Sequence, residues 1–213
     1  MIRFVHWIRR SAGRLSCRLF RDDRAAQIVE FACTLPLMII FVVGIFDFSG
    51  AFTLRQKLTN IARDAARAAA SDPGTDLAAP TTALPASISD AFQLIYNYMV
   101  ANNLNTCAIT PASFVNGPGL ASWNATGTGN GCPAGGLTIY INRGYYFPQT
   151  STTLPSVICA AQPAVSGQVT VLSTCVSIQY AYAWRFGRAA SLLGSTTTLP
   201  TVITATAVAM NEN

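Results

Sequence analysis

The longest apolar stretch of the chain lies near its N-terminus and predicts a membrane helix. Residues 31–46 carry no charge, and the stretch continues to Phe52 with Asp47 as its single charged residue. As a helix with a rise of about 1.5 Å per residue, residues 31–52 span roughly 33 Å, which matches a bilayer core of about 30 Å. The pattern therefore predicts one transmembrane helix.

A secretory signal peptide is the competing interpretation of this stretch. Ser49, Gly50 and Ala51 offer small residues at the spacing that signal peptidases prefer. Against it, some thirty residues precede the apolar stretch, which also exceeds the roughly 7–15 apolar residues of a signal peptide. A membrane anchor is the favoured interpretation.

The helical pattern continues beyond the apolar stretch. Between Leu54 and Ser71, apolar residues recur at spacings of three and four, without Gly or Pro until Pro73-Gly74. The pattern predicts one continuous helix of roughly 45 residues that ends at this break. Its alanine-rich end either spaces the following domain away from lipid or forms a packing spine whose small residues admit close neighbours. The stripe consists of Leu54, Leu58, Ile61, Ala65 and Ala69.

The rest of the chain predicts an α+β head. After a Pro/Thr/Ala-rich linker, Ile88, Phe92, Ile95 and Met99 form one stripe of a short helix, with Ser87 or Ser89 as its N-cap. Apolar and polar residues then alternate over 137–142, 176–184 and 201–210, which predicts an antiparallel sheet packed against a helix. Segment 116–136 contains seven glycines and predicts a flexible surface loop, since it lacks the partners of a phosphate-binding loop. Residues 188–193 could add one or two helical turns between the last two strands.

These patterns together predict four parts. They are a basic cytoplasmic leader (1–25), a transmembrane and spine helix (26–71), a linker (72–87) and an exported α+β head (88–213).

The net charge of +5 comes from the N-terminal arm. Seven arginines and two aspartates lie within residues 1–24, whereas the rest of the chain is neutral overall. An arginine arm can bind nucleic acid through phosphates, but directly before an apolar stretch it is typical of a cytoplasmic flank. We therefore expect no nucleic-acid partner, a cytoplasmic N-terminus and an exported head.

The head offers few groups for catalysis. No Asp or Glu lies between Asp90 and Glu212, and the single histidine, His6, belongs to the N-terminal arm. Paired-carboxylate catalysis, a Ser-His-Asp arrangement and carboxylate or histidine metal sites are therefore not expected there. We predict no enzyme, no cofactor, no metal and no small-molecule substrate.

Four of the six cysteines lie in the predicted head: Cys107, Cys132, Cys159 and Cys175. In an exported domain they predict two disulfides, with three possible connectivities, of which pairing of chain neighbours is preferred. Binding of a metal by the four thiolates is the alternative, but the short paired spacing of zinc modules is absent.

Glu30 lies at the start of the apolar stretch, where an ionisable group is costly unless something pairs with it. It either reaches water at the interface or neutralises a cationic N-terminus created by cleavage nearby, in its own or an adjacent subunit. The second case would make Glu30 an assembly residue.

Residues 24–71, together with a looser pattern over 168–212, resemble the TadE-like pseudopilins of the tight-adherence (Tad, or Flp) pilus system. The family pattern combines an R-A-x-x-x-V-E-F-type start, a proline early in the helix and an AAR-x-AAR-type segment. The matching positions are Arg24, Val29, Glu30, Phe31, Pro36, Gly44, Asp47, Ala62, Arg63, Ala65, Ala66 and Arg67.

The resemblance implies a single-pass inner-membrane minor pilin whose leader a prepilin peptidase removes. Counting Glu30 as the fifth mature residue places the cut between Ala25 and Ala26, where the family's best-known pilin pattern has glycine before the cut and Glu-Tyr after it. Glu30, Phe31 and Asp47 are then the candidate assembly residues. The implied partners are the inner membrane, other pilins and pseudopilins, the Tad assembly platform and the prepilin peptidase, with the pilus or cell surface as a further location.

Two functions follow as hypotheses. The chain assists, primes or caps assembly of a Tad-type pilus, or it is a membrane-tethered envelope or adhesive binding protein that never enters a fibre.

Overall fold

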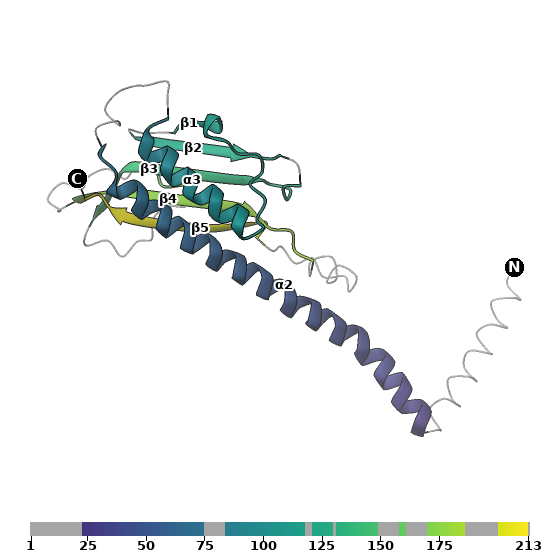
Figure 1. Ribbon diagram of the computed structural model, residues 1–213. Coiled ribbons are helices and arrows are strands. Elements are labelled where there is room, and N and C mark those ends of the chain that lie inside the picture. Colours follow the sequence, from purple (N-terminus) through teal and green to yellow (C-terminus); the bar gives the residue numbers. More distant parts are fainter. Residues whose placement is uncertain are drawn as a thin grey trace, which may run out of the picture. The chain divides into compact units, whose positions relative to one another are not determined.

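The computed structural model of the 213-residue chain describes residues 23–74, 84–117, 121–129, 131–148, 158–160, 170–185 and 200–212. Most of the predicted leader, much of the predicted linker and segment 188–193 lie outside these residues. The elements in chain order are α2 (Asp23–Ser71), α3 (Ala86–Ala101), the 3-10 helix η2 (Pro111–Ser113), β1 (Phe114–Asn116), β2 (Ser122–Gly127), β3 (Leu137–Pro148), β4 (Thr170–Ala181) and β5 (Val202–Met210) (Figure 1).

α2 confirms the prediction of one continuous helix through the apolar stretch and the alanine-rich segment. It has 49 residues and contains Pro36. It ends at Ser71, two residues before Pro73, because proline disfavours helical backbone in the residue before it. The described residues divide into two compact units at Asp47, and those from Phe48 to Trp184 and from 200 to 212 form the unit called here the head unit.

The sheet of the head unit has five antiparallel strands in the order β1-β2-β3-β4-β5, so each strand pairs with its neighbour in sequence. Ile139 pairs with Ile178, and Val176 with Ala207, so the predicted alternation places apolar residues on one face. The α+β prediction with an antiparallel sheet is confirmed.

The main core lies between this apolar face and two helical segments, α3 and the part of α2 that belongs to the head unit (Figure 1). Both predicted stripes face it. Leu58, Ile61, Ala65 and Ala69 of α2 are fully buried, and so are Ile88 and Ile95 of α3. The alanine-rich segment is therefore a packing element of the head unit, as the spine interpretation proposed.

Three local predictions were wrong. The glycine-rich segment 116–136 contains β2, and a side chain at Gly127 would collide with the carbonyl oxygen of Cys107, so this glycine serves close packing. The strand predicted over 176–184 ends at Ala181, and the indole N–H of Trp184 beyond it donates a hydrogen bond to the carbonyl of Pro200. Pro85, and neither Ser87 nor Ser89, is the N-cap of α3.

Candidate functional site

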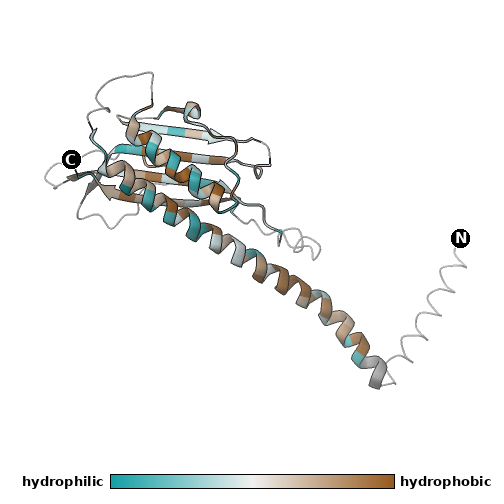
Figure 2. Cartoon of the chain, in the orientation of Figure 1, coloured by the Kyte–Doolittle hydropathy of each residue, from teal (hydrophilic) through white to brown (hydrophobic). Residues whose placement is uncertain are grey.

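The first part of α2 presents large apolar side chains on its surface. Phe31, Met38 and Phe46 are 64%, 68% and 73% exposed, and Figure 2 shows this part of the helix as predominantly hydrophobic. The segment Gln27–Ser71 is long and apolar enough to cross a membrane. Because water solvates such a surface poorly, lipid is the environment that suits it. α2 is thus built as a single-pass membrane anchor.

The three predicted assembly residues lie on α2 in different surroundings. Glu30 and Phe31 are exposed near the N-terminal end of the helix. Asp47 is only 6% exposed, although Phe46 and Phe48 on either side of it are exposed. About 25 Å of helix separates Glu30 from Asp47 at roughly 1.5 Å per residue. The structure does not bring the two carboxylates together.

The predicted cleavage positions, Ala25 and Ala26, lie in the first turn of α2. The backbone at this bond is helical in the structure.

A buried arginine joins the end of α2 to the sheet. Arg143, on β3, is 2% exposed, and its guanidinium donates hydrogen bonds to the backbone carbonyls of Asp72 (2.7 Å) and Pro73 (3.3 Å). These carbonyls directly follow the last helical residue, where the helix dipole favours a positive charge. Arg143 therefore neutralises the C-terminal end of α2.

The C-terminal residues of the described chain reinforce this contact. Asn211 donates to the backbone carbonyl of Arg143 (3.1 Å) and accepts from the hydroxyl of Thr174 (2.6 Å). The backbone N–H of Glu212 donates to the carbonyl of Ala70 on α2 (3.3 Å). We call the set Arg143, Thr174, Asn211 and Glu212 the helix-end clamp. Its chemistry is electrostatic and structural.

This role of Arg143 was not predicted from the sequence, although a signal was present. Arg143 follows Leu137, Ile139 and Ile141 at a spacing of two, so the alternation placed it on the buried face of its strand. A cation at an inward position needs acceptors. The carbonyls of Asp72 and Pro73 could be identified only from the tertiary structure.

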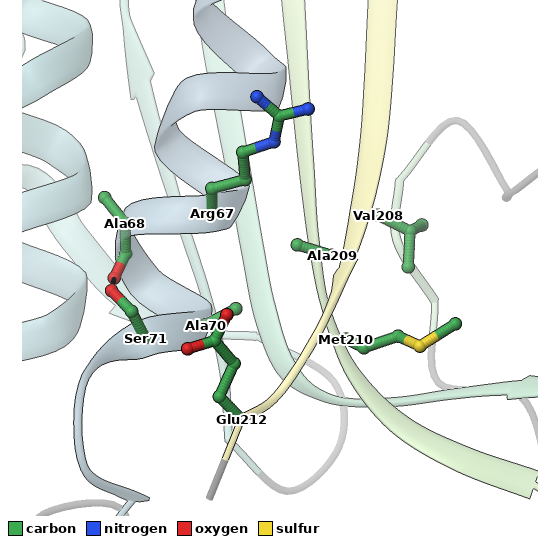
Figure 3. A pocket seen from close by; sticks show the side chains of 8 residues that line it. All are labelled: Arg67, Ala68, Ala70, Ser71, Val208, Ala209, Met210 and Glu212. Atoms are coloured by element: carbon green, nitrogen blue, oxygen red, sulfur yellow. Dashed lines mark hydrogen bonds between the residues drawn. The ribbon is translucent and has the colours of Figure 1, made fainter.

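A surface hollow of about 580 Å³ lies beside the clamp (Figure 3). Its lining residues come from the end of α2 and the end of β5 and are mostly small or apolar: Arg67, Ala68, Ala70, Ser71, Val208, Ala209, Met210 and Glu212. In Figure 3 the Glu212 carboxylate lies toward Ala70 and Ser71, whereas the Arg67 guanidinium points away from it. The hollow therefore offers one cation and one anion that do not converge on a common point.

The four cysteines of the predicted head form two disulfides in the structure. Cys107 bonds Cys132 with 5.1 Å between Cα atoms, and Cys159 bonds Cys175 with 5.7 Å. This is the pairing of chain neighbours preferred from the sequence. The first bond ties the segment after α3 to the segment after β2. The second lies against Tyr145 in a small cluster of its own, on the sheet face opposite the helices.

An aromatic cluster lies at the other end of the head unit. The ring centroid of Trp184 is 5.2 Å from that of Phe48 on α2 and 4.9 Å from that of Tyr182. The indole N–H of Trp184 donates to the carbonyl of Pro200 (2.6 Å). The cluster therefore joins the chain that leaves β4 to α2 and to the start of β5.

Titratable chemistry in the described head unit is sparse. Burial raises the pKa of Tyr180, and a hydrogen bond with the backbone of Asn105 lowers it in part. Among the described residues, no three His, Cys, Asp or Glu side chains gather as metal ligands would. The polar groups described above serve to hold elements together.

One comparison with known proteins finds a match, and it lies in the N-terminal helix. Residues 25–67 match the sequence model of the family TadE, described as TadE-like protein. The match lies wholly within α2 and confirms the resemblance there, while the looser pattern over 168–212 lies outside it. No match was found among curated proteins or among solved structures.

Proposed function

We propose that the chain is a membrane-anchored pseudopilin. It assists, primes or caps the assembly of a Tad-type pilus. The basis is the segment of α2 that matches the TadE-like family, which is associated with pili. The observation that carries the proposal is that the matched residues 25–67 cover two successive stretches of one helix, an exposed apolar stretch and a stretch whose apolar stripe is buried in the head unit. A pilin-like subunit needs both parts of the helix. The exposed apolar part holds it in the membrane, and the buried part keeps the folded domain attached to the helix.

We infer the topology from charge. Residues 1–24 are cytoplasmic, and the head is periplasmic, since seven arginines precede the apolar stretch whereas Arg55 and Lys57 follow it. The two disulfides support this orientation, because disulfides persist in oxidising compartments. A reporter active only in the periplasm, fused after Met210, should be active. Activity of a cytoplasmic reporter alone at that site would overturn the orientation.

We also infer that a prepilin peptidase cuts between Ala25 and Ala26. Small residues on both sides leave room for an active site, and Arg24 marks the place where charge gives way to apolar sequence. The cut would also create a partner for Glu30. Its carboxylate would pair with the new N-terminal ammonium of its own or a neighbouring subunit. The partners are then the inner membrane, other pilins and the assembly platform.

The test is N-terminal sequencing of the protein from sheared pili and from inner membrane of the native host. Mature chain that begins at Ala26 in the sheared fraction supports the proposal. Replacement of Ala25 by Leu should block the cut, and Asp23→Asn, which leaves both flanking alanines, is the control. Full-length chain confined to the membrane, in a host whose peptidase processes other pilins, would contradict it.

That second outcome would favour the alternative, a membrane-tethered envelope or adhesive binding protein. The head unit is compatible with it, because a disulfide-containing sheet suits an exported binding domain. Neither function requires a cofactor, a metal or a small-molecule substrate in the head.

A further inference from the structure

The aromatic cluster contacts α2 within the stretch predicted to span the membrane. Phe48, which contacts Trp184, precedes the end of the apolar stretch at Phe52. A side chain at Gly50 would have its Cβ 2.9 Å from the hydroxyl of Tyr182, so this ring also lies close to the helix. Arg55, the first basic residue after the stretch, lies about 10 Å further along the helix than Phe48 at roughly 1.5 Å per residue. The aromatic end of the head unit is therefore level with the membrane boundary.

The chemistry of this end suits the boundary zone of a bilayer. Phe48 and Phe52 are 52% and 62% exposed, and Val202, at the adjacent start of β5, is also exposed. Tyr182 and Trp184 are half-buried and combine an apolar ring with a polar group. Such side chains are enriched where hydrocarbon meets headgroups, since one part of the ring is apolar and the other wet.

The cluster is held in a fixed arrangement. The indole N–H of Trp184 donates to Pro200, and the backbone N–H of Tyr182 donates to the carbonyl of Thr201 (2.9 Å). Both bonds tie residues 182–184 to the start of β5, whose other end is bound to Ala70 of α2 through Glu212. The rings therefore keep their height along α2 as part of the head unit.

We propose that Tyr182 and Trp184 form an interfacial anchor. They insert into the headgroup region of the same bilayer that holds α2, and so set the depth of the helix and seat the head unit on the lipid surface. The partner of this anchor is lipid, because Trp184 packs on Phe48, which belongs to the same apolar helix that crosses the bilayer. The proposal rests on the membrane span of α2 and is independent of a role in pili.

The experiment uses the full uncut chain in phosphatidylcholine vesicles and the quenching of tryptophan fluorescence by brominated lipids. The chain has three tryptophans, Trp7, Trp123 and Trp184. Trp7→Phe with Trp123→Phe leaves Trp184 as the reporter. Trp7→Phe with Trp184→Phe leaves Trp123 on β2. The nearby Ala121 accepts a hydrogen bond from the backbone N–H of Arg143, so Trp123 lies near the clamp, at the far end of the head unit. This second variant is the matched control.

Lipids with bromines close to the headgroup should quench Trp184 several-fold more strongly than Trp123, and more strongly than lipids with bromines near the chain ends. Equal quenching of Trp184 and Trp123, or strongest quenching of Trp184 by deep bromines, would overturn the anchor. Failure of the chain to float with the vesicles would overturn the membrane span itself and is scored separately. If Trp123→Phe does not fold, Trp123 is kept in the protein. The quenching of Trp184 is then the difference in quenching between the variant Trp7→Phe and the double variant Trp7→Phe with Trp184→Phe.

Discussion

Apolar residues in the two parts of α2 lie in different environments. Around residues 28–46 the large apolar side chains are exposed, with Ile45 at 68%, whereas Ile61 in the head unit is fully buried. In the first region apolar residues cover the whole circumference of the helix, and in the second they form a stripe with Arg63, Asp64 and Arg67 outside it. A helix that is apolar all round fits lipid, and one with a stripe fits a protein surface. The difference teaches that periodicity, more than hydrophobicity, distinguishes membrane contact from core contact.

The sharpest test of this comparison replaces the same residue type in each region. Ile61→Ala should lower the free energy of unfolding of the head unit by about 2–5 kcal/mol, because it removes buried methylene groups and leaves a cavity. Ile45→Ala, the matched control, should change this free energy little, since its side chain contacts no core. Chemical denaturation in detergent, followed by near-UV circular dichroism, measures both. Equal effects would contradict the division of α2.

The second disulfide should have the next largest effect. Cys159 and Cys175 are 16 residues apart, and a loop of this size contributes about 3 kcal/mol in the chain-entropy model. Cys159→Ala with Cys175→Ala should lower the midpoint of unfolding accordingly. Removal of the exposed thiol with Cys33→Ala is the control and should have no effect on the head unit. Thiol counting on denatured, unreduced protein checks the bonds directly, and four free thiols among the head cysteines would refute them.

Loss of the helix-end clamp should be smaller but specific to its place. Arg143→Met keeps the bulk of the side chain and removes its hydrogen bonds to Asp72 and Pro73, which should cost about 2 kcal/mol. Arg185→Met, at an exposed position, should change stability by less than about 0.5 kcal/mol. Hydrogen exchange should show faster exchange in the last turns of α2 only for Arg143→Met. Unchanged exchange there would show that Arg143 does not hold the helix end.

Glu30→Gln should have no measurable effect on the fold, because Glu30 is exposed and outside the head unit. Its effect should appear in assembly: the charge that would pair with a cationic N-terminus is lost, while the shape of the side chain is kept. We expect normal membrane insertion and reduced piliation, scored by shearing and electron microscopy. Normal piliation would remove Glu30 from the assembly residues.

Much of the fold was predictable because local patterns act over neighbouring residues. The uncharged stretch and the spacing of Leu54, Leu58 and Ile61 predicted α2, and the alternation over 137–142 predicted part of β3. The TadE-like segment was recognisable for the same reason, since its motif residues lie close together in one helix. β2 was missed because Gly127, its last residue, and Gly129 just after it lie close against the Cys107 segment, and that contact joins residues distant in sequence.

By itself, the sequence determined where the chain is apolar, where it is charged and which period each segment has, because these properties belong to single residues and their spacing. Only the tertiary structure decided that Arg143 meets the end of α2 and that Trp184 meets Phe48, since both contacts join residues far apart in the chain. The physical reason is that a buried cation or a half-buried indole has many potential partners. Packing of the whole sheet against the helices selects one of them.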